Sequence, residues 1–127
     1  MVSSVGIHPL EITLAEYLAS RQSEPVRVID VREQDEWDAG HMAEATLLPL
    51  GELAERRHEL DHESPLVIVC RSGRRSLIAA DYLRRLGFPA ARSLAGGMIA
   101  WAASAAAEIA SLPSKPLTSS LSSGSWC

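Results

Sequence analysis

The chain contains little cysteine, few aromatic residues and no long hydrophobic run, and each shortage excludes a class of protein. Its 127 residues include two cysteines, Cys70 and Cys127, which form no disulfide framework, so we expect a reducing, cytoplasmic setting. Aromatic residues make up 5% of the chain and form no clear interface stripe, so a monomer is the default expectation. No apolar run reaches the roughly 18 residues of a membrane span. The opening stretch MVSSVGIHPLEIT also lacks the basic region and apolar block of a secretory signal.

What the chain does contain is typical of a small globular domain. Hydrophobic residues make up 46% and charged residues 22% of the sequence, and 127 residues are enough for one core. We expect a single domain over residues 1–110. Residues 111–127, SLPSKPLTSSLSSGSWC, are rich in serine and proline and are typical of a disordered tail, in which Cys127 has no predicted role.

Charge is distributed unevenly along the chain, whose formal net charge is −4. Residues 30–63 contain eleven acidic residues against three arginines, whereas residues 66–92 contain six arginines against Asp81 alone. Nucleic-acid binding needs a broadly basic face, so this dipolar pattern does not indicate a nucleic-acid partner. Positive charge gathered near residue 70 favours a small anionic ligand instead.

Short apolar runs alternate with helical patterns, which predicts an α/β fold. VRVID (26–30) and LVIVC (66–70) have the length and β-branched composition of buried strands, while ATLLPL (45–50) and ARSL (91–94) are weaker candidates. A short edge strand is also expected near residue 5. Strands of this kind, separated by helices, predict a parallel sheet with helices on both faces.

Four helices are expected between and after these strands. Thr13 and Glu16 have the spacing of a capping box that opens the first, and GELAERRHEL (51–60) indicates the second. An apolar stripe at helical spacing predicts the third over residues 76–86, and the same spacing from Met98 onward predicts the last.

Cys70 lies at the predicted junction of a buried strand and a helix, within VIVCRSGRRS (67–76). Ligands bind at the carboxyl ends of strands in open α/β sheets. The short loop, bent at Gly73, and the first helical turn at Ser76 are expected to gather backbone amides around the thiol as an anion-holding concavity. Such amides and adjacent cations lower the pKa of a cysteine from about 8.5. Cys70 is therefore predicted to be an ionised nucleophile.

The common alternative for a cysteine at the end of a strand is a small buried hydrophobe. Three arginines and a glycine directly after Cys70 make that interpretation unfavourable here. Arg71, Arg74 and Arg75 add full charges, although not all three can point inward. A solvated surface role is the ordinary expectation for each arginine, least so for Arg75.

Four blocks of the sequence together resemble the rhodanese sulfurtransferases. They are VIDVREQDEWDAGHM (28–42), LLPL (47–50), VIVCRSGRRSLIAADYLRRLGF (67–88) and LAGGMIAW (94–101), in the order and spacing of that family. The resemblance covers about residues 5–105. It implies a three-layer α/β fold, in which helices flank a parallel five-stranded sheet on both faces. It also implies thiosulfate sulfurtransferase activity without a metal or a cofactor.

In the mechanism that the resemblance implies, the Cys70 thiolate attacks the outer sulfur of an anionic donor such as thiosulfate and expels sulfite. The Cys70 persulfide then passes its sulfur to cyanide or, in cells, to a thiol. The loop amides hold the persulfide, and Arg75 closes the loop and helps to bind the donor. The substrate-binding residues implied in this way are Arg71, Ser72, Gly73, Arg74, Arg75 and Ser76, supported by Asp30, which steadies the loop, and by Arg32.

Residues outside the loop receive structural roles from the same resemblance. Arg32 is expected to pair with Glu36, and His41 to fix a turn through a hydrogen bond. Trp101 is expected to belong to the core. The turn GHMAEA (40–45) departs from the GHIPGA of the family, so the resemblance does not predict its local geometry.

Three alternative functions use the same segment differently. A phosphatase of a related fold needs five residues between its cysteine and its arginine, whereas four separate Cys70 from Arg75. A non-catalytic rhodanese module for binding or regulation commonly lacks the cysteine, or the glycine and arginine of the loop, which are all present here. A persulfide carrier would deliver sulfur to a thioredoxin-like or sulfur-relay protein, and the sequence does not separate it from a small-molecule enzyme.

The basic loop favours thiosulfate as the sulfur donor over mercaptopyruvate, because enzymes that use mercaptopyruvate tend to carry a less charged loop.

Overall fold

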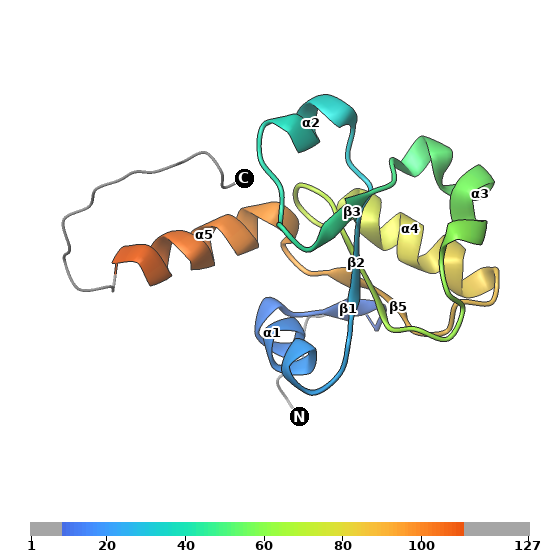
Figure 1. Cartoon of the computed structure of the whole chain (residues 1–127), viewed down its shortest axis with the longest axis horizontal. Coiled ribbons are helices and arrows are strands. Elements are labelled where there is room, and N and C mark those ends of the chain that lie inside the picture. The colour runs from blue at the N-terminus through green and yellow to red at the C-terminus, as the bar shows by residue number, and fades with distance from the viewer. Residues whose placement is uncertain (1–8, 111–127) are drawn as a thin grey trace.

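The computed structural model describes residues 9–110, which form a parallel sheet with helices on both faces (Figure 1). The predicted three-layer α/β architecture is therefore confirmed. The strands are β1 (Glu11–Ile12), β2 (Arg27–Asp30), β3 (Ala45–Leu47), β4 (Leu66–Val69) and β5 (Ala91–Leu94). They lie in the order β1-β5-β4-β2-β3, so β4 occupies the centre of the sheet.

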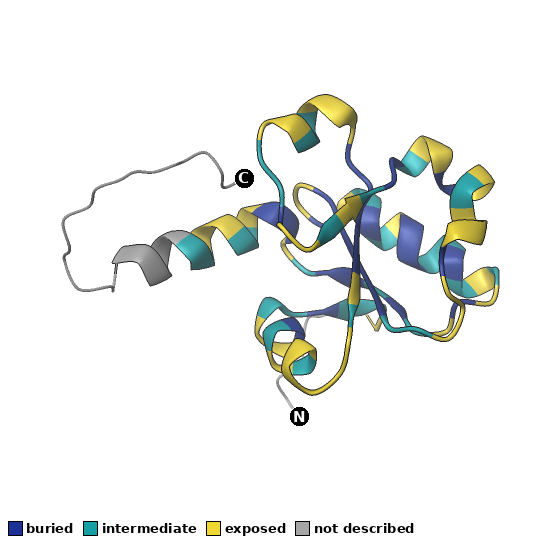
Figure 2. Cartoon of the chain, viewed as in Figure 1, coloured by how far each residue is buried: buried dark blue, intermediate teal, exposed yellow. Residues whose placement is uncertain are grey.

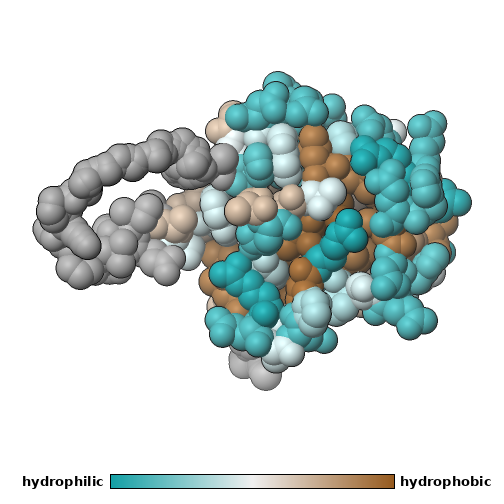
Figure 3. All heavy atoms as spheres, in the orientation of Figure 1, coloured by the Kyte–Doolittle hydropathy of each residue, from teal (hydrophilic) through white to brown (hydrophobic). Residues whose placement is uncertain are grey.

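Helices connect the successive strands and cover the sheet. They are α1 (Leu14–Ser23), α2 (Gln34–Asp38), α3 (Leu53–Arg56), α4 (Arg74–Arg85) and α5 (Gly97–Ala110), with the 3-10 turns η2 (Leu50–Glu52) and η3 (Arg57–Glu59) on either side of α3. Hydrophilic side chains cover the outer surface over α2 and α3 (Figure 3). None of the helices within residues 9–110 combines the length and apolarity that crossing a bilayer requires.

Side chains of the central strands alternate between two apolar clusters, one on each face of the sheet. Ile68 and Cys70 belong to the cluster that includes Leu83 of α4, whereas Val67 belongs to the cluster that includes Tyr17 of α1. Burial on both faces explains why these strands are apolar almost throughout (Figure 2). The alternation also directs the Cys70 side chain to the face that α4 covers.

Two predicted helices have different bounds in the structure. Residues 51–60 do not form one continuous helix but the short turns η2, α3 and η3. Among these residues only Leu53 and Leu60 are buried, so a longer helix would have no apolar stripe to pack. Helix α4 begins at Arg74 rather than at Ser76. The left-handed bend of the loop falls on Gly73, which is the N-cap, so helical geometry begins at the next residue.

The first helix begins as predicted. The Thr13 hydroxyl accepts the amide of Glu16, and the Glu16 carboxylate accepts the amide of Thr13, which completes a capping box. The sequence pattern does not predict β1 or α2, because elements of 2 and 5 residues are too short to show a period. The strand expected near residue 5, the tail at 111–127 and Cys127 lie outside the described residues.

Glu44 is one of the residues at which the turn at 40–45 departs from the family pattern, and its side chain contacts α1. Its carboxylate accepts hydrogen bonds from the Tyr17 hydroxyl at 2.7 Å and from the Arg21 guanidinium at 2.8 Å. Burial, followed by the hydrogen bond to Glu44, raises the pKa of Tyr17 to about 12, so the phenol remains a donor at neutral pH. The turn is thereby tied to α1.

Candidate active site

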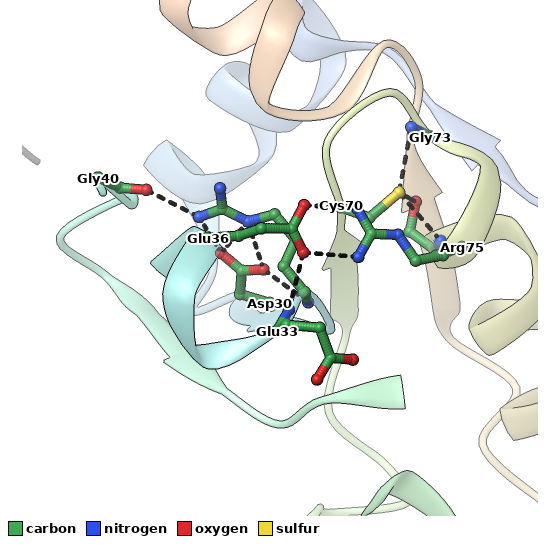
Figure 4. A network of polar contacts seen from close by, with 9 residues as sticks. Asp30, Glu33, Glu36, Gly40, Cys70, Gly73 and Arg75 are labelled. Carbon is green, nitrogen blue, oxygen red and sulfur yellow. Dashed lines mark hydrogen bonds and ion pairs between the residues drawn. The ribbon is translucent and has the colours of Figure 1, made fainter. Parts of the chain in front are cut away.

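The segment between β4 and α4 forms a tight loop around the sulfur of Cys70 (Figure 4). Gly73 permits the bend because its φ of +104° lies in the left-handed region. A Cβ at this position would also lie 3.3 Å from the amide nitrogen of Gly96. The bend turns the following amides, at the start of α4, toward the sulfur.

The Cys70 sulfur accepts hydrogen bonds from backbone amides and lies against a hydroxyl. It is 3.2 Å from the Gly73 nitrogen, 3.3 Å from the Ser76 nitrogen and 3.4 Å from Ser76 Oγ. Burial raises the pKa of the thiol. The hydrogen bonds with the Ser76 hydroxyl and with the amides of Ser76, Gly73 and Ser72 outweigh burial and lower the pKa below its ordinary value. The loop therefore favours a thiolate at a residue that is 1% exposed.

The N-terminus of α5 holds the outer side of the loop. The Met98 amide donates to the Cys70 carbonyl at 2.8 Å, and the Ile99 amide donates to the Arg71 carbonyl at 3.1 Å. In a trans peptide the carbonyl and the following N–H point in opposite directions. Binding the Arg71 carbonyl from outside therefore turns the Ser72 N–H inward, toward the sulfur.

Arg75 extends from the first turn of α4 to α2, where it forms a bidentate ion pair. Its Nη1 and Nη2 atoms lie 2.7 and 2.8 Å from the two carboxylate oxygens of Glu36 (Figure 4). The Arg75 guanidinium is the largest cause that lowers the pKa of Glu36, to about 2. The stability that the pair contributes is present above about pH 4.3 and is lost as the pH falls toward 2. At neutral pH the pair joins α2 to the cysteine loop.

The expected pair between Arg32 and Glu36 is wrong. Arg32 instead donates from Nε and Nη2 to the carboxylate of Asp30, at 2.9 and 2.8 Å, and from Nη2 to the Gly40 carbonyl at 2.8 Å. Both charged side chains are buried, and a buried charge needs a partner at short range. Within residues 9–110 the Asp30 carboxylate bonds Arg32 and no residue of the cysteine loop, so any support for the loop is indirect.

A surface pocket of about 680 Å³ opens beside the loop. Its lining includes Arg71 from the loop, His41 from the turn after α2, and Ile99 and Trp101 from α5. In the described part of the chain, the exposed side chains of Arg71 and Arg74 form no ion pair. Arg71 is therefore the loop cation that an anion in this pocket would meet without displacing a carboxylate.

His41 makes the structural contact expected of it, whereas Trp101 belongs to the core only in part. His41 Nδ1 lies 2.9 Å from the Trp37 carbonyl oxygen, and the two rings stack with centroids 3.5 Å apart. Trp101 is partly buried: it packs against the apolar cluster on the α1 face of the sheet and also lines the pocket beside the loop. Across the described residues, no three side chains of the metal-binding types cluster together.

Ser93 contacts the site, although sequence reasoning does not assign it there. Its Oγ lies 2.7 Å from Ser76 Oγ, and both residues are fully buried. They meet because β5 pairs with β4 in a register that places Ser93 beside Ile68. The one signal available in the sequence is a small polar residue inside the weaker strand candidate ARSL (91–94).

Comparison with known proteins connects these features to one family. The family model for the Rhodanese-like domain matches residues 13–104. Over 92 residues the chain is 34% identical to the thiosulfate sulfurtransferase GlpE of Pseudoalteromonas translucida, covering 72% of this chain and 88% of GlpE. Over 78 residues it is 36% identical to YrkF of Bacillus subtilis, whose name describes a sulfur carrier protein, covering 61% of this chain and 42% of YrkF. The chain thus spans less than half the length of that relative.

A solved structure agrees with the sequence matches. The human single-domain sulfurtransferase TSTD1 aligns with a TM-score of 0.67 at 28% identity, covering 76% of this chain and 97% of TSTD1. The family match, the parallel sheet and the cysteine loop all agree with the resemblance found in the sequence. The chain belongs to the rhodanese-like domain family, whose named relatives include sulfurtransferases.

Proposed function

We propose that the chain is a thiosulfate sulfurtransferase in which Cys70 is the nucleophile. The observation that carries this proposal is the buried sulfur at the centre of a loop of inward amides, with contacts of 3.2 and 3.3 Å. Such a loop stabilises a thiolate before the reaction and a charged persulfide after it. The name of GlpE, a thiosulfate sulfurtransferase, supports thiosulfate as the donor.

The proposed reaction has two halves that share one covalent intermediate. In the first half, the Cys70 thiolate attacks the outer sulfur of thiosulfate, the sulfur–sulfur bond of the donor breaks, and sulfite leaves with the bonding electron pair. In the second half, cyanide or a thiolate attacks the outer sulfur of the persulfide, and the Cys70 thiolate leaves. Electrons and atoms balance without an external oxidant or reductant, so the proposed chemistry needs neither a metal nor a cofactor.

Magnitudes favour an ionised sulfur in spite of its burial. Full burial disfavours a charged group by roughly 4–7 kcal/mol. A hydrogen bond to a charged acceptor contributes about 1.5–3 kcal/mol. Bonds from the Ser76 hydroxyl and from the amides of Ser76, Gly73 and Ser72 together contribute about 6–12 kcal/mol on this scale, enough to offset the penalty. These groups are fixed by the fold before the donor arrives, so they need no rearrangement during the reaction.

The same geometry favours a sulfur acceptor over a phosphatase. The amides of Gly73 and Ser76 both point at one atom, and four residues separate Cys70 from Arg75. A tetrahedral phosphate needs a wider ring of donors around several oxygens. We therefore propose that the loop holds a single additional sulfur atom.

Delivery of the sulfur to a protein is the second candidate function. The name of YrkF, which describes a sulfur carrier, favours it, and so does the opening of the 680 Å³ pocket beside the loop. The proposed protein partner carries a reactive thiol, as a thioredoxin-like or sulfur-relay protein does. If this function is correct, a reduced thioredoxin-like protein discharges the persulfide faster than the same concentration of a small thiol.

Ping-pong kinetics test the proposed enzyme. Incubation with thiosulfate alone is expected to release one sulfite per chain, and addition of cyanide to the desalted protein is expected to release one thiocyanate per chain. Parallel lines in double-reciprocal plots of the steady-state rates are the expected pattern. Thiocyanate that forms only when both substrates are present together would contradict a covalent intermediate.

Replacement of Arg75 tests whether the ion pair with Glu36 leaves this arginine a role in donor binding. In Arg75→Ala we expect the KM for thiosulfate to rise about tenfold and persulfide formation to slow, because a bidentate cation beside the loop is lost. Glu36→Gln keeps Arg75 and removes its neutralising carboxylate, so the KM is expected to stay equal or to fall. Arg85→Ala, at the far end of α4, is the matched control. Unchanged kinetics in Arg75→Ala would show that this arginine does not bind the donor.

A further inference from the structure

A chain of hydroxyl groups extends from the reactive sulfur into the interior of the protein. Cys70 Sγ lies 3.4 Å from Ser76 Oγ, which lies 2.7 Å from Ser93 Oγ, which in turn lies 3.5 Å from the Gly73 carbonyl oxygen. Ser76 and Ser93 are both 0% exposed, so water does not compete for these contacts. Within residues 9–110, no buried side-chain oxygen or nitrogen lacks a partner.

Counting hydrogens along this chain gives two alternative arrangements. Each hydroxyl has one hydrogen to donate and can also accept. When Cys70 is a thiol, it donates to Ser76, Ser76 donates to Ser93, and Ser93 donates to the Gly73 carbonyl. When Cys70 is a thiolate, Ser76 must donate to the sulfur, so the short Ser76–Ser93 contact then requires Ser93 to be the donor. Loss of the thiol proton, together with rotation of the two hydroxyl hydrogens, converts the first arrangement into the second.

We propose that Ser93 is a positioning residue whose hydroxyl donates to Ser76 Oγ and thereby directs the Ser76 hydrogen onto the Cys70 sulfur. Because an accepted hydrogen bond polarises a hydroxyl, it also strengthens the bond that the hydroxyl donates. Without Ser93, the buried Ser76 oxygen loses its partner on that side, and its hydrogen is no longer constrained to point at the sulfur. Ser93 thus stabilises the thiolate without touching it.

The position of Ser93 in the sheet explains how it reaches the loop. Ser93 lies in β5 and pairs with Ile68 of the neighbouring strand β4. Ile68 is two residues before Cys70 in the sequence. Three charged side chains lie near the loop. Arg75 on α4 interacts electrostatically with Cys70, Glu36 on α2 pairs with Arg75, and Arg71 lines the pocket. Substitutions at position 93 leave all three charges in place.

The inference rests on the proposed role of Cys70, but its readout does not require sulfur transfer. In a Cys127→Ser background, Cys70 is the one remaining cysteine of the sequence. The pH midpoint of its thiolate is measured from ultraviolet absorbance and from the pH dependence of alkylation. These measurements are made on four proteins: the background, Ser93→Ala, Ser76→Ala and the double variant. A thiolate can therefore be detected even if thiosulfate proves not to be the donor.

The double variant distinguishes positioning through Ser76 from a general packing effect. Ser76→Ala is expected to raise the midpoint by about one pH unit, and Ser93→Ala by about half a unit, or threefold in thiolate fraction at a given pH. The double variant is expected to match Ser76→Ala, because Ser93 acts only through that hydroxyl. Additive effects of the two substitutions, or an unchanged midpoint in Ser93→Ala, would overturn the proposal.

A conservative variant keeps the test decisive if a substitution weakens the fold. Ser93→Thr retains the hydroxyl and adds a methyl group at a fully buried position. Its thermal stability is expected to fall, while the midpoint of the thiolate stays within about 0.2 pH units of the background, a shift far below that of a lost hydrogen bond. A midpoint in Ser93→Thr equal to that of Ser93→Ala would show that packing, and not the hydroxyl, sets the thiolate.

Discussion

The Cys70→Ser variant is expected to gain no sulfur from thiosulfate and to form no thiocyanate, whereas the wild-type chain gains the mass of one sulfur atom. A serine hydroxyl stays protonated at neutral pH and cannot form a persulfide, so the loss is complete rather than partial. Serine is close to cysteine in shape, and the amides of Gly73 and Ser76 can still bond its oxygen. The fold is therefore expected to survive. Intact-protein mass spectrometry before and after cyanide treatment measures the result.

The second cysteine of the chain supplies the matched control. Cys127→Ser removes a thiol while keeping Cys70, and it is expected to load one sulfur as the wild type does. Alkylation of a separate aliquot before loading establishes that the Cys70 thiol is free in the wild type and in Cys127→Ser. If the Cys70→Ser variant gained sulfur, or if Cys127→Ser failed to gain it, the assignment of the chemistry to Cys70 would be wrong.

Gly97→Ala is expected to produce the largest effect of any substitution that leaves the sulfur in place. Gly97 has a φ of +53°, and a Cβ there would collide with the carbonyl oxygens of Cys70 and Arg71. Left-handed strain and overpacking together predict a loss of about 2–4 kcal/mol of unfolding free energy. Pushing α5 away also releases the two carbonyls that it holds, so the Ser72 amide turns from the sulfur. Persulfide formation is expected to slow about 100-fold, as for loss of a fixed donor in an oxyanion site.

Two other glycines separate the effect on the loop from a general loss of stability. Gly51→Ala adds a Cβ with no atom within 4 Å, so both stability and sulfur loading are expected to stay near wild type. Gly96→Ala has a φ of +80° and a Cβ that would lie 2.8 Å from the Ala100 side chain, away from the loop carbonyls. It is expected to lower the unfolding free energy with a smaller loss of activity than Gly97→Ala. Equal rates of loading in Gly96→Ala and Gly97→Ala would contradict a specific role for the α5 contact.

The strands were predictable from the sequence where burial on both faces makes a segment apolar throughout. VRVID and LVIVC correspond to β2 and β4, the two strands that lie next to each other in the middle of the sheet order. Strand β1 was not predictable, because its 2 residues at the edge of the sheet carry no repeating pattern. The segment 51–60 has the composition of a helix, but with two buried residues it forms only short turns.

The candidate site was predictable only where its groups are close in sequence. The loop from Cys70 to Ser76 is contained in one motif, whose spacing alone indicates amides around a thiol. The partners of Arg75 and Ser76 were not predictable. Glu36 is 39 residues from Arg75, and Ser93 is 17 residues from Ser76, so the order of the strands decides these contacts. Arg32 was assigned the wrong partner because a buried guanidinium takes the carboxylate nearest to it, which belongs to Asp30.

A pH titration of the Cys70 thiolate in the Cys127→Ser variant is the most direct measurement, because everything proposed for the loop depends on an ionised sulfur. The predicted result is a midpoint clearly below the value of about 8.5 for a free cysteine, with the rate of persulfide formation from thiosulfate rising along the same curve. A midpoint at or above that value would contradict the claim that the loop amides and the Ser76 hydroxyl outweigh burial.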